Sequence, residues 1–426
     1  MNTDTVADTV VIGAGIAGLV AAISAAEQGA SVVVLEAHQP GGRARTTARD
    51  GWSLNVGPHA LYRGGHLTAF LAARGVRPPG GVVATTSMGV VLGDRVHEVS
   101  MTPMGVMRIP VLGRRSRLRL ASMFVRLNRM NTGALVGRSV DDWLADEPDD
   151  VRAFLQMFLR LATYVDAPAR FDAGAAAEQL RLSTAGVVYL HGGWATLVGH
   201  LRSLAETLGV QVIDHQTVTS ITNDGGHGRA VVHCGDDSVS ATSVVVAAGG
   251  PDTAERLTGT TVQHRAGLTE PITASCLDLG VRRSLARPAF AMDRAMYVSP
   301  HAPLADLAPA GHGLVSALRY LAPGETPASP GDEQALLRDF ARLAGVADDD
   351  VVMERALHRV VVAHGAPTAA GGGLAGRPPI DALGLPGVYL AGDWVGAHGL
   401  LADASTASGE RAGKAAAAFA RASIAA

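Results

Sequence analysis

Residues 9–36 have the sequence TVVIGAGIAGLVAAISAAEQGASVVVLE. Two parts of this stretch, residues 9–12 and 31–35, have the length and valine-rich composition of buried strands. Residues 16–28 between them have the pattern of a helix that ends at Gly29. Continuous apolar strands are typical of a parallel sheet covered on both faces. The stretch therefore predicts a βαβ unit.

Three glycines, Gly13, Gly15 and Gly18, stand between the first strand and the helix in the spacing G-x-G-x-x-G. In this position the first glycine permits a tight turn, the second lets the backbone approach a pyrophosphate, and the third allows close packing of helix on strand. The helix N-terminus offers free N–H groups and a positive dipole to phosphates. Glu36 ends the second strand, near the spacing expected for a carboxylate that binds ribose hydroxyls. The unit therefore predicts a dinucleotide site.

A second glycine pattern, Gly371-x-Gly373-x-x-Gly376, lacks this context. It follows a loop and continues into Arg377-Pro378-Pro379 without a helix, so we interpret it as a flexible connection.

The composition limits the class of protein. A chain of 426 residues exceeds the size of one compact core, which predicts two domains. The net charge of -3 gives no basic face for a nucleic acid, so that partner is not expected. Cys234 and Cys276 stand alone, which predicts two buried thiols and neither a disulfide nor a metal site.

The apolar run at residues 10–26 resembles a signal peptide or membrane span only in composition. Asp4 and Asp8 stand where a signal peptide would be basic, and the three glycines interrupt the run. We therefore expect a cytoplasmic enzyme.

Two further motifs identify the kind of dinucleotide. Residues 40–45, PGGRAR, follow the βαβ unit, and residues 388–394, VYLAGDW, precede Leu401-Ala402-Asp403 at the start of a final Ala-rich helix, expected at residues 404–420. In this order the motifs resemble those of the FAD-dependent superfamily of amine oxidases, protoporphyrinogen oxidases and phytoene desaturases, phytoene desaturases most of all. The resemblance implies non-covalently bound FAD, with Arg43 or Arg45 on the phosphates, Asp393 on the ribityl or pyrophosphate region, and the final helix directed at the flavin.

Three shorter segments fit the same resemblance. Residues 209–221 resemble the strand pair whose backbone, at a residue such as Val218, holds the adenine. Residues 191–194, HGGW, resemble a Gly-Gly segment that re-enters the nucleotide domain, and residues 56–59, VGPH, an element beside the isoalloxazine. The cofactor-binding residues expected in all are Gly13, Gly15, Ile16, Ala17, Gly18, Glu36, Ala37, Gly42, Arg43, Gly57, Pro58, Val218, Gly392, Asp393, Leu401 and Ala402.

The fold expected is α/β, with a Rossmann-type FAD-binding domain in three segments (GR2-like) and an inserted α+β substrate domain. The FAD-binding domain is expected at residues 1–80, 192–270 and 365–426. The substrate-binding domain is expected at residues 81–191, mostly helical after about residue 114, and 271–364, where strands and helices mix.

Candidate catalytic residues are His59, Trp194 and His398. A histidine near the flavin can take or give a proton near neutral pH. The alternative for His59 is a residue that only hydrogen-bonds to the flavin or the backbone. The alternative for His398 is a residue that caps its loop. Trp194, Trp394 and Tyr62 are candidates for walls around the ring or substrate, with core packing as the alternative. Tyr297 and Tyr320 fall in the inserted domain.

Three departures from the superfamily restrict the chemistry. Lys414 is the only lysine and lies in the final helix, so the lysine that many amine oxidases place near flavin N5 is missing. Neither cysteine lies near residues 392–393, which excludes the cysteinyl-flavin bond of monoamine oxidases. The length of the chain and its 4% of aromatic residues speak against a long polyene tunnel.

We therefore expect an oxidase, dehydrogenase or desaturase that moves a hydride from a substrate C–H bond to flavin N5 and forms a C=C or C=N bond. The substrate is expected to be a small organic molecule of specialised metabolism, and the electron acceptor oxygen or a quinone. A lysine-independent amine oxidase and a non-redox flavoprotein isomerase are the alternatives, whereas the complete motif set speaks against carriers related to Rab GDP-dissociation inhibitors. The sequence leaves the substrate and the oligomeric state open.

Residues 108–129 include seven arginines interleaved with apolar residues. A basic amphipathic helix of this kind suits an anionic lipid surface. A helix with a solvated arginine face is the interpretation we favour, so membrane association is not expected.

Overall fold

The computed structural model describes residues 5–83, 86–223 and 229–425. One of its two large sheets has the strand order β10-β2-β1-β13-β12-β11, with β19 also paired to β13. Strands β10, β2, β1, β13 and β19 run parallel to their neighbours in that group, whereas β11 and β12 are antiparallel. The strands are β1 (Thr5–Ile12), β2 (Val32–Leu35), β10 (Gln211–Ile213), β11 (Ser220–Asn223), β12 (Ala230–Cys234), β13 (Asp237–Val246) and β19 (Val388–Leu390).

Both faces of this first sheet are covered. Successive side chains of a strand point to opposite faces, so each strand contributes to a core on either side. Val11 packs under the helices α1 (Ile16–Ala26), α8 (Trp194–Thr207) and α11 (Leu401–Ala425). Val10 and Ile12 pack in a second core on the other face, with α9 (Pro251–Thr258). Apolar strands enclosed in this way are what the βαβ pattern predicts.

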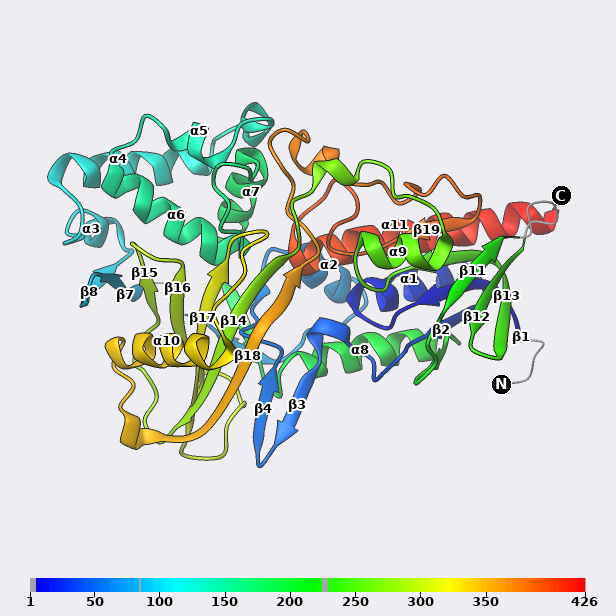
Figure 1. Ribbon diagram of the computed structural model, residues 1–426, viewed down its shortest axis with the longest axis horizontal. Helices are drawn as coiled ribbons and strands as arrows, with labels where there is room; N and C mark the ends of the chain where they lie inside the picture. Colours follow the sequence, from blue (N-terminus) through cyan, green and yellow to red (C-terminus); the bar gives the residue numbers. More distant parts are fainter. Residues whose placement is uncertain (1–4, 84–85, 224–228, 426) are drawn as a thin grey trace.

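The final helix α11 lies along α1 (Figure 1). Gly409 and Gly413 form this contact, because a Cβ on either would collide with the backbone carbonyl of Ala17 or Ala21. The two helices therefore approach backbone to backbone, although they stand at opposite ends of the chain.

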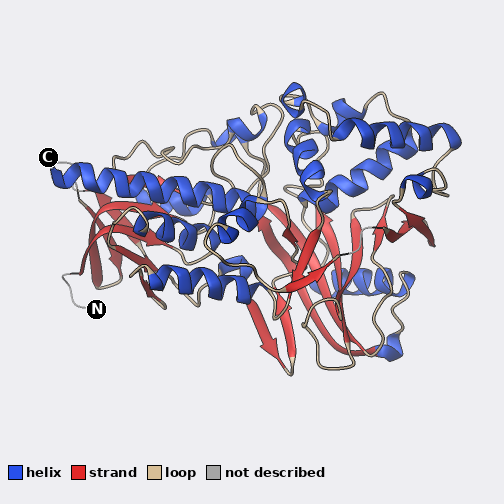
Figure 2. Cartoon of the chain, turned by 180° about the vertical axis from the view of Figure 1, so that it is seen from behind, coloured by secondary structure: helices blue, strands red, loops and turns tan. Residues whose placement is uncertain are grey.

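The second large sheet has the order β18-β14-β17-β16-β15-β7-β8. Figures 1 and 2 show α10 on one face and a layer of helices above the other. The strands are β7 (Ser87–Leu92), β8 (Arg95–Ser100), β14 (Ile272–Val281), β15 (Ala289–Ala291), β16 (Met296–Ala302), β17 (Gly313–Leu321) and β18 (Val351–Ala363). The helices are α3 (Pro103–Val106), α4 (Arg114–Leu127), α5 (Val140–Leu144), α6 (Asp149–Thr163), α7 (Ala173–Ser183) and α10 (Pro330–Leu343).

Smaller elements join the two sheets. They are α2 (His66–Ala72), the hairpin β3 (Thr46–Arg49) and β4 (Trp52–Asn55), a small sheet of β5 (Leu61–Tyr62), β6 (Gly80–Val82) and β9 (Val187–Leu190), and the short 3-10 turns Gly42–Ala44, Thr132–Leu135, Arg265–Gly267, Asp348–Asp350 and Gly373–Gly376. In the part of the chain that is described, no helix has both the length and the apolar character that a membrane crossing requires.

The α/β class and the Rossmann-like unit expected from the sequence are confirmed. The domain boundaries stay a prediction. Some element bounds differ: β13 begins at Asp237 because residues 237–241 pair antiparallel with β12 on one edge, while residues from 239 onward pair in parallel with β1 on the other edge. Helix α11 begins at Leu401 and is longer than expected, since its contact with α1 and the sheet continues past the glycine positions.

Candidate cofactor and substrate site

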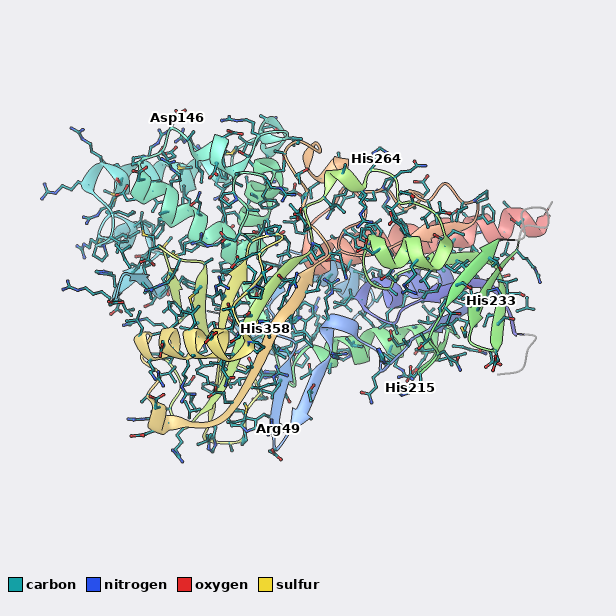
Figure 3. All side chains as sticks on the ribbon, viewed as in Figure 1. Arg49, Asp146, His215, His233, His264 and His358 are labelled. Atoms are coloured by element: carbon teal, nitrogen blue, oxygen red, sulfur yellow. The ribbon has the colours of Figure 1, made fainter. Side chains whose placement is uncertain are left out.

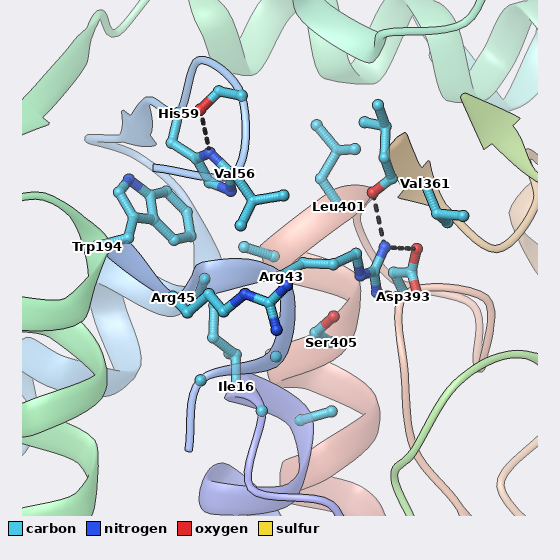
Figure 4. Close-up of a pocket in the computed structure, with 18 of the residues that line it drawn as sticks. Ile16, Arg43, Arg45, Val56, His59, Trp194, Val361, Asp393, Leu401 and Ser405 are labelled. Carbon is cyan, nitrogen blue, oxygen red and sulfur yellow. Dashed lines mark hydrogen bonds and ion pairs between the residues drawn. The ribbon is translucent and has the colours of Figure 1, made fainter. Parts of the chain in front are cut away.

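A cavity of about 460 Å³ lies where the first sheet meets the second. It is bordered by the glycine loop, the start of α11 and the edge strand β18 (Figure 4). Fifteen of the residues expected from the sequence line it: Gly13, Gly15, Ile16, Ala17, Glu36, Gly42, Arg43, Gly57, Pro58, His59, Trp194, Gly392, Asp393, Leu401 and Ala402. The structure therefore brings most of the predicted site together from distant parts of the chain.

The glycine loop has the geometry of a phosphate cradle. Gly13 has a φ of +100°, which favours glycine, and its N–H donates to the carbonyl of Leu35 at 2.8 Å. A Cβ on Gly15 would meet nothing within 4 Å, so this backbone borders open space. A Cβ on Gly18 would collide with the carbonyl oxygen of Gly13, so this glycine serves helix packing and does not line the cavity.

Glu36 both lines the cavity and holds the loop. Its Oε2 accepts from the backbone N–H of Ala14 at 2.7 Å, and its Oε1 accepts from the N–H of His38 at 3.0 Å. The carboxylate is thereby fixed at the end of β2, the position expected for a ribose-binding acid.

Arg43 and Asp393 form an ion pair within this cavity. The guanidinium donates to both carboxylate oxygens, at 3.0 and 2.8 Å, and to the carbonyl of Val362 at 2.6 Å (Figure 4). The side chain of Asp393 is 1% exposed, whereas that of Arg43 is 35% exposed and still faces the cavity. His364, which the sequence analysis missed, completes the cluster: its backbone N–H donates to Asp393 at 2.9 Å, and its ring Nδ1 lies 3.1 Å from the carboxylate.

The charge state of Asp393 follows from these partners. Burial alone would raise its pKa, but the positive charge of Arg43 and the hydrogen bonds from His364 and Arg43 lower the pKa well below its usual range. Asp393 is therefore ionised at neutral pH.

Arg377 holds the loop that carries Asp393. Its side chain is buried and donates to the carbonyls of Gly396 at 2.6 Å, Asp393 at 3.1 Å and His398 at 3.1 Å. Burial lowers its pKa to about 10, so it stays charged at neutral pH. The preceding glycines are also packed tightly, since a Cβ on Gly376 would collide with the carbonyl of Gly371. The segment is a structural clamp, and its interpretation as a flexible connection is wrong.

A second cavity, of about 560 Å³, adjoins the first. The two share six lining residues, Pro58, His59, Ala60, Tyr62, Tyr164 and Leu401. The rest of the second lining comes mainly from apolar side chains of the helical layer and the second sheet, including Met88, Met101, Phe124, Phe158 and Phe290. None of its described lining residues is Asp, Glu, Lys or Arg.

His59 stands in the wall between the cavities. Its Nδ1 lies 2.9 Å from the carbonyl oxygen of Gly57 (Figure 4), and because a carbonyl only accepts, this nitrogen carries a proton. Burial and the charge of Arg43 lower the pKa of His59, against the opposing effect of the Gly57 and Arg43 carbonyls. The ring is therefore neutral at neutral pH and can accept a proton. It meets the ring of Trp194 edge to face, with centroids 4.8 Å apart.

Tyrosines form the other side of the wall. Tyr164, which the sequence analysis did not single out, lies in the left-handed region with a φ of +61° just after α6. Its hydroxyl lies 3.2 Å from the carbonyl of Pro58, to which it donates, and 3.2 Å from the hydroxyl of Tyr297. Tyr62 lines both cavities and donates to the carbonyl of Ala162 at 2.8 Å. Tyr320 packs behind this group, 5.6 Å from the ring of Tyr297.

Several expected residues lie elsewhere. Val218 is buried beside β2 in the core of the first sheet, and neither it nor Ala37 lines either cavity. His398 is exposed outside both cavities, and Trp394 is packed in the core, with its Nε1 donating to the carbonyl of Gly249 at 3.1 Å. His215, His264 and His358 are exposed and line neither cavity (Figure 3). Lys414 is exposed and pairs with Glu410 at 2.6 Å.

The two cysteines are buried and free. Cys276 lines the first cavity, a position that the sequence did not indicate, and burial raises the pKa of its thiol far above the usual value. It is therefore an unreactive wall residue. No group of three or more metal-binding side chains occurs among the described residues.

Helix α4 accounts for most of the arginine-rich segment. It buries Ser116, Leu120, Met123 and Leu127 and exposes Leu118 and Val125, each 61% exposed, among its arginines. Val125 also lines the second cavity, so this helix borders the apolar space.

Comparison with known proteins agrees with this site. The model of the family described as "DAO: FAD dependent oxidoreductase" matches residues 8–411. Hydroxyneurosporene desaturase of Rhodobacter capsulatus is 48% identical over 78 residues, which are 18% of this chain and 15% of that protein, so the match spans a small part of the relative.

The fold is shared with solved structures of low sequence identity. An oxidoreductase from Methanosarcina mazei has a TM-score of 0.78 at 20% identity, over 95% of this chain and 99% of that one. A putrescine oxidase solved with putrescine has a TM-score of 0.75 at 17% identity, over 97% and 100% of the two chains. A putative protoporphyrinogen oxidase from Exiguobacterium sp. 255-15 has a TM-score of 0.71 at 16% identity, over 98% and 99%.

The expected resemblance to the amine oxidase, protoporphyrinogen oxidase and phytoene desaturase superfamily is thus confirmed. Because the family model spans almost the whole chain, this protein belongs to the FAD dependent oxidoreductase family and is an FAD-dependent enzyme.

Proposed function

We propose that the enzyme removes a hydride from a C–H bond of an uncharged, largely apolar organic molecule and forms a C=C or C=N bond. The observation that carries this proposal is the shared wall of the two cavities. One cavity has the glycine loop and paired charges of a dinucleotide site, and the other is apolar and has no charged group among its described lining residues. A substrate in the second cavity would meet the cofactor at His59, Tyr164 and Leu401.

The residues of the first cavity fit FAD. The backbone at Gly15 borders open space at the N-terminus of α1, where a pyrophosphate is favoured. Glu36 is placed for ribose hydroxyls, and Arg43 retains an exposed side toward the cavity. Trp194 has a buried Nε1 with no hydrogen-bond partner in the described structure, a donor that a bound group would satisfy. FAD held here supplies the hydride acceptor, flavin N5.

The side chains at the wall have separate roles in this proposal. His59, held neutral by burial and oriented by the Gly57 carbonyl, accepts the proton that the substrate loses. Tyr164 is fixed by Pro58 and Tyr297 and shapes the opening between the cavities. The apolar lining of the second cavity excludes water from the reacting bond.

Formation of C=C is favoured over oxidation of an amine. A protonated amine would enter a cavity whose described lining offers no carboxylate, and an unpaired buried charge is strongly unfavourable. The desaturase named among the relatives also supports C=C formation. The same proposal includes oxygen or a quinone as the electron acceptor, a role in specialised metabolism and a cytoplasmic location. It also includes an α4 helix whose arginines face solvent and do not bind a membrane.

The test is anaerobic mixing of the FAD-loaded enzyme with candidate polyenes, porphyrinogens and amines while the flavin absorbance is recorded. We expect an uncharged substrate to bleach the flavin and His59→Ala to slow the bleaching by about 100-fold, the range of a general base. Conversion without any bleaching would overturn hydride transfer and favour the isomerase. An unchanged rate in His59→Ala would remove only the proton-accepting role.

A further inference from the structure

One part of the second cavity is lined by hydrogen-bonding side chains. Tyr297, Ser299 and His301 occupy alternate positions of β16, and all three line the cavity because alternate residues of a strand share a face. Tyr297 is already bonded to Tyr164. Ser299 and His301, each 3% exposed, are therefore the polar groups of interest in this part of the cavity.

Ser299, His301 and Tyr189 form one connected group, which we call the polar corner. The hydroxyl of Ser299 lies 3.0 Å from Nε2 of His301. Tyr189, from β9, stacks on the imidazole with ring centroids 4.0 Å apart and planes 19° from parallel. The contacts fix the positions of the hydroxyl and imidazole groups.

The polar corner has more hydrogen-bonding capacity than its internal contacts use. An imidazole has two ring nitrogens, and a serine hydroxyl has one donor and two acceptor positions. The bond between Ser299 and His301 uses one position on each, and a hydrogen bond with the Tyr189 side chain uses a second position on Ser299. The other imidazole nitrogen of His301 and one position of the Ser299 hydroxyl are left over. Buried polar groups are rarely left unpaired, so a ligand atom or water would complete the group.

The partner of the polar corner would be uncharged. Burial is the main cause that lowers the pKa of His301 to about 3, so the ring is neutral near pH 7. One ring nitrogen of His301 is engaged by Ser299, and the other donates or accepts according to the tautomer, which suits a hydroxyl or carbonyl oxygen. The cavity provides no described charged side chain that would pair with an ionic group.

We infer that the polar corner is a binding subsite for a neutral oxygen, a hydroxyl or carbonyl, on an otherwise apolar substrate. The inference rests on the proposed function, because it assigns the second cavity to the substrate. Binding of the oxygen at the polar corner fixes which carbon of the substrate lies at the wall beside His59 and Tyr164. The polar corner therefore determines the position of oxidation. The apolar lining contributes affinity but does not orient the substrate.

The test compares two ligands of equal chain length, decan-1-ol and 1-decene, on the FAD-loaded enzyme. Binding of each ligand is measured by its displacement of the neutral fluorescent probe N-phenyl-1-naphthylamine from the cavity. Dissociation constants are measured for the wild type, Ser299→Ala and His301→Leu. Ser183→Ala is the matched control, because Ser183 lines the same cavity but its hydroxyl already donates to the Leu180 carbonyl at 2.6 Å.

We expect Ser299→Ala and His301→Leu to weaken decan-1-ol about five- to tenfold, the value of one hydrogen bond, and to leave 1-decene within about twofold. Ser183→Ala should change neither ligand. His301→Gln, which keeps an amide donor and acceptor, should recover part of the alcohol affinity and serves if His301→Leu folds poorly. Equal weakening of both ligands, or no change in either, would overturn the subsite.

The subsite and the proposed function fail in different ways. Selective loss of decan-1-ol binding, with no candidate substrate able to bleach the flavin, would keep the subsite and reject hydride transfer. Bleaching by a substrate, with no alcohol-selective effect of Ser299→Ala or His301→Leu, would keep the proposed function and reject the subsite.

Discussion

The guanidinium of Arg43 donates to both carboxylate oxygens of Asp393, although 350 positions separate the two residues in the sequence. Removing Arg43 would leave an ionised, buried carboxylate with His364 as its main partner. We expect Arg43→Leu to lower the free energy of unfolding by about 3 kcal/mol, the lower end for a broken buried pair. Urea unfolding and FAD content provide the measurement. The double variant Arg43→Leu/Asp393→Leu should recover part of the stability, and a single variant within about 0.5 kcal/mol of the wild type would contradict the prediction.

The same pair predicts how stability depends on pH. The pKa of Asp393 is lower in the folded than in the unfolded chain, so its contribution is complete above the unfolded value of about 4 and is lost as the pH falls toward the folded value. We expect the urea midpoint of the wild type to fall between pH 6 and pH 3.5 more steeply than that of Asp393→Asn. Parallel curves for the two proteins would show that other carboxylates govern the acid response.

Two glycines of the loop separate packing from cofactor binding. Gly18→Ala places a methyl group against the Gly13 carbonyl and should destabilise the fold by about 1–3 kcal/mol, with loss of FAD. Gly15→Ala meets no atom within 4 Å, so the apoprotein should unfold as the wild type does while FAD binds more weakly. Thermal unfolding of the apoproteins and FAD titration distinguish the two effects. Normal FAD affinity in Gly15→Ala would show that the cofactor does not approach this backbone.

The hydrogen bonds of Arg377 should strengthen FAD binding, although Arg377 does not line the cofactor cavity. Arg377→Met leaves three carbonyl oxygens without their donor, and we expect a loss of about 3 kcal/mol in unfolding free energy and weaker FAD binding. Arg377→Lys keeps the charge but loses the planar guanidinium, so its unfolding free energy and FAD affinity should lie between those of the wild type and Arg377→Met. Arg411→Met, at an exposed arginine of α11 that lines neither cavity, is the control for loss of an arginine charge. A stable Arg377→Met variant with full FAD content would contradict the clamp.

The parts of the site that the sequence predicts are those with local requirements. Gly13, Gly15 and Glu36 must stand at fixed places around one turn, so their spacing is sufficient to find them. Arg43 and Asp393 belong to short motifs, but their mutual pairing depends on the approach of β18 and the 392–393 turn, which no local pattern contains. The resemblance placed both at the cofactor, and the structure adds that each is the other's partner.

The residues that the sequence analysis missed depend on contacts between distant segments. Tyr164 ends a helix in the substrate region and reaches the wall through Pro58 and Tyr297. Ser299 and His301 share a face only once β16 is placed in its sheet. His398 was expected near the flavin because it stands close to α11 in sequence, but Arg377 holds its carbonyl and its side chain is exposed.

The backbone contact of α11 with α1, made through Gly409 and Gly413, has a consequence for biosynthesis. The glycine loop is translated well before the helix that covers α1 and closes the cavity at Leu401 and Ala402. While the nascent chain grows, the apolar face of α1 remains uncovered and the cradle lacks one side. We therefore expect FAD to bind only after α11 has been translated, and a premature stop codon before α11 to abolish the holoenzyme even when every glycine of the loop has been made.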